Sequence, residues 1–220
     1  MHSHNHPSRT SSIKCYFCAS QLDNVAPDVK YPMCSYCSNS NSKSVLLRIC
    51  MLNPSIDPIA LANRCMLHPS IPIHGPQHHY LTACVVLGWL RALGFKVEEH
   101  MFKIAIERSS IIPGGTCGTM GLCGAPIGAS TALAVFLRST PLKPRERTLS
   151  LKVASEGLRI IEEIDGVRCC KASTYASIIA ASKILAEELG IGFKVEKVLC
   201  IFSDKNPDCL KSSCPFYHKS

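Results

Sequence analysis

Two pairs of cysteines near the start of the chain constrain its folding most strongly. The pairs, Cys15-Tyr-Phe-Cys18 and Cys34-Ser-Tyr-Cys37, are separated by fifteen residues. Four thiolates in two Cys-x-x-Cys pairs suit tetrahedral zinc. A module of about thirty residues is too small to form a hydrophobic core and needs a bound metal ion to hold its fold. We therefore predict a zinc-ribbon-like module over residues 13–43 with these four cysteines as ligands. A rubredoxin-like iron centre with the same ligands is the alternative.

Cysteine usage also indicates the compartment. The chain has 14 cysteines in 220 residues, and 46% of its residues are hydrophobic, which is enough for one buried core with small appendages. Residues 1–12, MHSHNHPSRTSS, lack the apolar centre of a secretion signal, so we expect a disordered tail and a cytoplasmic protein. In that compartment, cysteines indicate metal or redox chemistry rather than disulfides.

Charge and hydropathy narrow the possible partners. No stretch reaches the roughly 18 to 20 apolar residues that span a bilayer, so no membrane contact is predicted. The net charge of +8 permits contact with nucleic acid, but its basic residues are scattered and specify no such partner. Nucleic-acid binding is therefore possible but not favoured.

The pattern of the remaining chain is mainly helical. Apolar residues recur at three- and four-residue spacing over residues 44–192, which predicts a domain of five to six helices. The expected helices cover residues 57–68, 76–94, 97–110, 124–139, 147–164 and 171–190. The polar run 38–44 is typical of a linker, and residues 193–203 alternate enough for a strand or extended segment.

The chain ends in a cysteine-rich segment, residues 193–220. Its spacing, Cys200-x8-Cys209-x4-Cys214-x3-His218, resembles the CCCH zinc fingers that bind single-stranded RNA, although those have five residues between the second and third cysteines. Two interpretations remain open: an independent finger, or a flap whose cysteines complete a site in the main domain. We favour the flap because few basic residues and few aromatic rings accompany the cysteines.

Three histidines lie close together at the start of an expected helix. His74 precedes Pro76, and His78 and His79 fall in the first turn. A helix N-terminus disfavours imidazolium, and neutral imidazole is the form that binds a metal or accepts a proton. The same residues could equally be helix caps or core histidines.

The glycine-rich stretch 113–130, PGGTCGTMGLCGAPIGAS, carries the second cysteine constellation. It contains Cys117 and Cys123, and no Gly-Lys-Ser/Thr follows its glycines, so it is not a P-loop. Backbone at glycines such as Gly115 and Gly118 could approach a cofactor closely, with N–H groups free to bind cluster sulfides or an anion. Its later glycines, Gly124 and Gly128, have a structural alternative, because four-residue spacing lets two helices approach closely.

A third constellation, GVRCCK, places Cys169 and Cys170 at the start of the last long helix. Thiolates are favoured there, but adjacent side chains on a helix diverge by about 100°, so both are not expected to serve one centre equally.

These motifs together resemble an uncharacterised cysteine-rich family found mostly in anaerobic archaea and bacteria. The matching stretches are HGPQHHYL, PGGTCGTMGLCGAPIGA, GVRCCK and the final C-x8-C-x4-CPF, in order over roughly residues 45–218. That family has no established activity, so the resemblance implies no function for this chain.

A second resemblance is to small redox-assigned proteins named for a Cys-Gly-Cys-Ala-x-x-Gly motif. LCGAPIG and GVRCC are similar to its segments, which implies roles for Cys123 and Cys170. This chain departs from that motif in having Leu122 at the first cysteine position.

The leading hypothesis is a cytoplasmic metalloprotein of anaerobic metabolism. Zinc would occupy the N-terminal module, and an iron–sulfur cluster would be held by Cys117, Cys123 and Cys170, with Cys209 or Cys214 from the flap. The histidines would supply a further ligand or a proton relay. Its role would be electron transfer with a redox partner, or maturation of another metalloenzyme. The alternatives are a zinc-stapled nucleic-acid- or protein-binding module and a metal-dependent enzyme acting on a sulfur-containing substrate.

Overall fold

The computed structural model describes residues 13–22, 29–191, 195 and 197–218. In that part of the chain the fold is helical, with no β-strand, so the mainly α prediction is confirmed. The predicted tail, residues 1–12, lies outside the described residues. The α-helices are α1 (Ser35–Asn39), α2 (Ser42–Leu52), α3 (Pro58–Met66), α4 (Gln77–Ala92), α5 (Glu99–Ser110), α6 (Thr116–Thr119), α7 (Gly124–Phe136), α8 (Pro144–Glu162) and α9 (Cys170–Leu189).

The six expected helices correspond to α3, α4, α5, α7, α8 and α9. Their ends follow local signals: Asp57 caps α3 by accepting from the N–H groups of Ile59 and Ala60, and Gly190 ends α9 in the left-handed conformation. The polar run 38–44 is not the predicted linker, because the Asn41 side chain caps α2 and the helix begins at Ser42.

Residues 193–203, expected to form a strand or an extended segment, contain no strand in their described part. Val195 and residues 197–202 have no strand partner, and a short 3₁₀ helix begins at Ser203, while residues 193, 194 and 196 lie outside the described part. The alternating pattern here reflects burial of Val198 and Phe202 against the helices rather than pairing in a sheet. No helix in the described ranges is long and apolar enough to cross a membrane.

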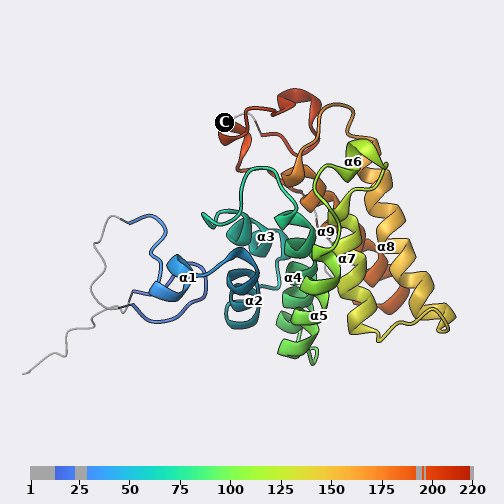
Figure 1. The fold of residues 1–220 in the computed structure, drawn as a ribbon, viewed down its shortest axis with the longest axis horizontal. Coiled ribbons are helices and arrows are strands. Elements are labelled where there is room, and N and C mark those ends of the chain that lie inside the picture. Colours follow the sequence, from blue (N-terminus) through green and yellow to red (C-terminus); the bar gives the residue numbers. More distant parts are fainter. Residues whose placement is uncertain (1–12, 23–28, 192–194, 196, 219–220) are drawn as a thin grey trace, which may run out of the picture.

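Helix α4 forms the centre of the core, and its residues from His78 to Leu90 are all buried. It packs against α5 and α7, while α8 covers both α7 and α9 (Figure 1). An almost continuously apolar helix is expected in such a position because every side meets another helix.

Helices α4 and α7 approach closely at two glycines. A Cβ atom at Gly128 would lie 1.8 Å from the His79 carbonyl oxygen, and one at Gly124 would lie 2.5 Å from the His79 ring. The Thr82 hydroxyl joins the two helices by donating to the Ala125 carbonyl oxygen (2.7 Å). These glycines therefore serve helix packing, and they fix His79 against the start of α7.

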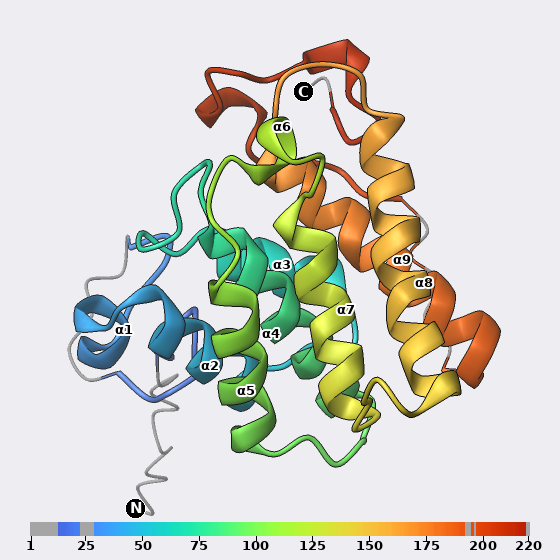
Figure 2. The same ribbon diagram turned by 45° about the vertical axis from the view of Figure 1, so that its right-hand side comes forward.

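The C-terminal segment lies beside α6 and the start of α9, at the same end of the molecule in both views (Figures 1 and 2). Phe202 and Phe216 are buried, and Phe216 makes an edge contact with Tyr175 of α9, with ring centroids 5.5 Å apart. The Cys200 N–H donates to the Phe216 carbonyl oxygen (2.7 Å), which closes the segment into a loop. It thus covers one end of the helical domain.

Candidate functional site

The four N-terminal cysteines form a group that could hold a metal ion, because their sulfur atoms all lie within 4.8 Å of one another. The Sγ atoms of Cys15 and Cys37 are 3.9 Å apart, and those of Cys18 and Cys34 are 3.7 Å apart. Zn–S bonds of about 2.3 Å in a tetrahedron place sulfurs about 3.8 Å apart. The arrangement therefore matches the size of a single tetrahedral ion.

Contacts with α2 and the loop after α3 anchor this module to the helical domain. Burial raises the pKa of Cys18, but hydrogen bonds from Ser20 and Arg48 of α2 outweigh it and lower the pKa to about 6. The His68 ring lies against Phe17 and its Nε2 is 3.1 Å from the Cys37 carbonyl oxygen. A metal here would fix both the module and its position on the domain.

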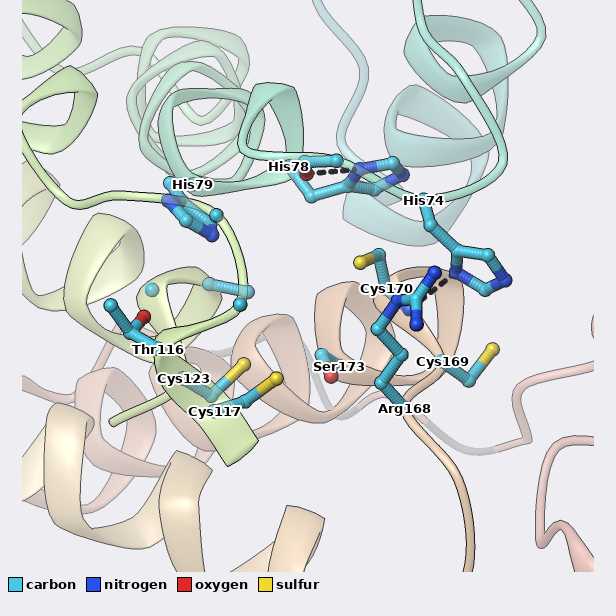
Figure 3. Close-up of a pocket in the computed structure, with 15 residues that line it drawn as sticks. His74, His78, His79, Thr116, Cys117, Cys123, Arg168, Cys169, Cys170 and Ser173 are labelled. Atoms are coloured by element: carbon cyan, nitrogen blue, oxygen red, sulfur yellow. Dashed lines mark hydrogen bonds between the residues drawn. The ribbon is translucent and has the colours of Figure 1, made fainter. Parts of the chain in front are cut away.

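The second candidate site is a cavity of about 300 Å³ where the N-terminal ends of α4, α7 and α9 meet. Figure 3 shows its side chains, which come from the turn before α4 and the first residues of that helix, from the glycine-rich stretch and from the GVRCCK segment. The lining residues that carry chemistry are His74, His78, His79, Cys117, Cys123, Arg168, Cys169 and Cys170. Fold and sequence thus bring the three predicted motifs to one place.

The cysteines of the cavity differ in exposure and direction. Cys117 is exposed, whereas burial raises the pKa of the Cys123 and Cys170 thiols. In Figure 3 the sulfurs of Cys117, Cys123 and Cys170 lie on the cavity side, and the Cys169 sulfur points away from them. Among the described residues, the N-terminal group alone has three or more possible ligand atoms all within 4.8 Å, so this cavity is wider than a single ion needs.

Two histidines present unprotonated nitrogens near the cavity. His78 is 1% exposed, and burial lowers its pKa to about 3, which keeps it neutral. Its Nδ1 lies 3.1 Å from the Gly75 carbonyl oxygen and must carry the proton, which leaves Nε2 with a lone pair. This Nε2 is buried and has no hydrogen-bond partner among the described residues. His79 has the same tautomer, because its Nδ1 lies 3.2 Å from the Ile112 carbonyl oxygen.

His74 connects the cavity to the C-terminal segment instead. Its Nδ1 accepts from the Cys170 N–H at 3.5 Å (Figure 3), and its Nε2 lies 3.0 Å from Asn206 Oδ1 and 3.5 Å from Asp208 Oδ2. Both ring nitrogens are therefore engaged, so His74 positions the start of α9 rather than offering a free ligand atom.

Three helix N-termini and an arginine side chain give the cavity a positive character. Helices α4, α7 and α9 all begin there without a side-chain cap, so their first N–H groups and dipoles favour an anion. Arg168 adds a cation to the lining, and Lys171, which follows Cys170, is fully buried without lining this cavity. Burial lowers the pKa of Lys171 to about 8, which the nearby cysteines oppose. Such a site suits thiolates and anionic cofactors.

The two predicted cofactor glycines face open space. A Cβ at Gly115 or Gly118 would meet no atom within 4 Å. Gly115 is needed for its turn, with φ of 87°, but Gly118 has no such backbone requirement. Gly115 lines the main cavity, whereas Gly118 does not line it and is exposed at the surface.

The remaining predicted cysteines lie elsewhere. Cys200, Cys209 and Cys214 do not line this cavity but a much smaller one, which Cys169 also lines. His218 is exposed and lines neither cavity, so the fourth ligand of a CCCH finger is not in place. The expectation that Cys209 or Cys214 faces Cys117, Cys123 and Cys170 does not match this placement.

Sequence reasoning missed several polar residues of the two cavities, among them Arg168, Lys171 and Asn206. Arg168 and Lys171 flank the cysteines of GVRCCK, which was a usable signal. Asn206 lies in a loop, and nothing in its sequence neighbourhood indicates its contact with His74.

The chain belongs to a family of unknown function, DUF5714, whose model matches residues 46–217. That range contains both cavities and begins after the N-terminal cysteine module. No curated protein and no solved structure matches the chain.

Proposed function

We propose that this protein is a cytoplasmic metalloprotein of anaerobic metabolism that carries an iron–sulfur cluster in the main cavity, held by Cys117, Cys123 and Cys170. The observation that carries this proposal is the convergence of three cysteines on a cavity that His78 also lines. The His78 Nε2 is buried and has no hydrogen-bond partner among the described residues. Thiolates are the usual ligands of iron–sulfur clusters, and imidazole replaces thiolate in some of them.

The dimensions favour a cluster over a single ion. The cavity volume of about 300 Å³ far exceeds one ion, and its cysteine sulfurs do not form a group within 4.8 Å. His78 would complete the ligand set through Nε2, since its Nδ1–H is already fixed by Gly75. When bound, the cluster would supply one-electron chemistry.

The surroundings support a role with a partner protein, in electron transfer or in maturation of another metalloenzyme. Cys117 lies at the surface, so a group bound there would be within reach of a partner. Met120 and Val167, which are 70% and 61% exposed, belong to the segments that carry Cys117 and Cys169. Zinc is the ion we propose for the N-terminal module, whose sulfur spacing suits it.

Metal and sulfide analysis tests this function. Full-length protein prepared without oxygen should be brown and contain iron together with acid-labile sulfide, because inorganic sulfide separates a cluster from a rubredoxin-like ion. A colourless protein holding zinc alone, even after reconstitution with iron and sulfide, would contradict the proposal. Salt-sensitive affinity for single-stranded RNA in that protein would favour the binding module instead.

A further inference from the structure

Four cysteines line a second, smaller cavity at the junction of α9 and the C-terminal segment. Cys169 precedes α9, and Cys200, Cys209 and Cys214 come from the segment that folds over it. We propose that these four cysteines bind one zinc ion, which fastens the C-terminal segment to the start of α9. This proposal is independent of the iron–sulfur cluster.

The enclosed space has the size of a single ion. The four cysteines line a cavity of about 20 Å³, which is close to the volume that holds one water molecule and too small for a cluster. Structural zinc sites are closed and four-coordinate, usually with sulfur ligands. No three of these sulfurs lie within 4.8 Å of one another, unlike those of the N-terminal module, so the segment would have to move inward for all four to bind one ion.

Backbone hydrogen bonds to sulfur match those of the N-terminal module. Phe202 N–H donates to Cys200 Sγ and Lys211 N–H donates to Cys209 Sγ, each at 3.4 Å. Burial raises the pKa of Cys214, and a backbone hydrogen bond from Phe216 opposes it. Each donor is two residues after its cysteine.

The same two-residue step occurs in the N-terminal module. There the backbone of Phe17 hydrogen-bonds to Cys15, and that of Ser20 to Cys18. Backbone donors aimed at sulfur stabilise thiolates and orient them toward a metal. The C-terminal cysteines therefore carry the local geometry of ligands, although their spacing in the sequence differs.

A buried cation supports a negative centre at this position. Lys171 is 0% exposed, its Nζ donates to the Pro72 carbonyl oxygen (3.1 Å) and lies 4.7 Å from the Phe202 ring centroid. No described carboxylate pairs with it. Buried lysines are rare unless paired. Four thiolates around Zn²⁺ carry a net charge of −2, which would compensate the lysine.

The fourth ligand is Cys169 rather than His218. The Asn206 side-chain amide donates to Cys169 Sγ (3.6 Å), while its Oδ1 lies 3.0 Å from His74 Nε2 in the wall of the main cavity. His218 is exposed. Zinc at this place would thus hold the segment that positions His74, and Cys169 and Cys170 would serve two different centres.

Zinc content of the full-length protein tests the site. Purified wild-type protein should contain two zinc ions per chain, one in each four-cysteine group. Cys169→Ala and Cys209→Ala should each contain one, Cys34→Ala should contain one, and the Cys34→Ala/Cys209→Ala double variant should contain none. Helical circular dichroism establishes that each variant is folded.

Two matched variants locate the ligands. His218→Ala and Cys117→Ala should keep both zinc ions, since neither residue lies in a four-cysteine group. If Cys169→Ala is too unstable to study, Cys34→Ala offers a second measurement, because it leaves only the C-terminal group with four cysteines. Cobalt bound to this variant should give the thiolate-to-cobalt absorption of a tetrahedral four-thiolate site. One zinc in the wild type, two in folded Cys209→Ala, or loss in His218→Ala with retention in Cys169→Ala would overturn the proposal.

Discussion

Replacing Cys170 with alanine should remove iron and sulfide from the main cavity, with more than a tenfold fall per chain, while both zinc ions remain. Cys170 lines that cavity but not the small one, and its backbone N–H is held by His74 Nδ1. Losing one of three thiolate ligands leaves too few soft donors to retain a cluster. Iron, sulfide and zinc per chain, measured after anaerobic reconstitution, give the result.

The neighbouring cysteine supplies the control. Cys169→Ala removes a thiol one residue away, yet it should keep the iron and sulfide, because the Cys169 sulfur points away from the cavity (Figure 3). Full iron content in Cys170→Ala with loss in Cys169→Ala would reverse the assignment of the two residues. Full content in Cys117→Ala, Cys123→Ala and Cys170→Ala alike would mean that the glycine-rich stretch holds no cluster.

Gly128→Ala should lower the free energy of unfolding by at least about 3 kcal/mol, near the upper end of the usual overpacking range. The new Cβ would lie 1.8 Å from the His79 carbonyl oxygen and 2.4 Å from Thr82 Oγ1. A backbone atom cannot move aside alone, so α7 would have to separate from α4. The roughly 1 kcal/mol gained in helix propensity does not offset this.

Chemical denaturation of the two proteins measures the difference. Gly118→Ala is the matched control, because its Cβ would meet no atom within 4 Å and its backbone φ is not positive. That variant should unfold at the wild-type midpoint or slightly above it, because it gains helix propensity without a clash. Equal midpoints for Gly128→Ala and Gly118→Ala would contradict the close contact of α4 and α7.

Most of the helices could be predicted because their signals are local. The periodic apolar residues of α3, α4, α5, α7, α8 and α9 and the caps at Asp57 and Gly190 are readable within a few residues. The four-cysteine module was equally accessible, since a ligand pair two residues apart needs little tertiary context. Short α6 carries no comparable periodic signal.

The grouping of the remaining cysteines could not be predicted, because it depends on contacts between distant segments. Phe202 and Phe216 seat the C-terminal segment on α9, and this packing brings Cys200, Cys209 and Cys214 to Cys169 instead of to the glycine-rich stretch. Spacing along the chain resembles a zinc finger that includes His218, and the favoured flap interpretation placed these cysteines at the site in the main domain. The roles of the glycines could not be predicted for the same reason. Gly128 allows the close packing of α4 and α7, whereas Gly118 borders open space.

Iron K-edge X-ray absorption of the anaerobically reconstituted full-length protein tests the central claim most directly. A cluster in the cavity predicts iron surrounded mainly by sulfur, with a second shell of neighbouring iron atoms, and this signal should vanish in Cys170→Ala. Iron with four sulfur neighbours but no iron neighbour would indicate a rubredoxin-like ion in the N-terminal module. Iron bound by oxygen and nitrogen alone would likewise contradict the cluster.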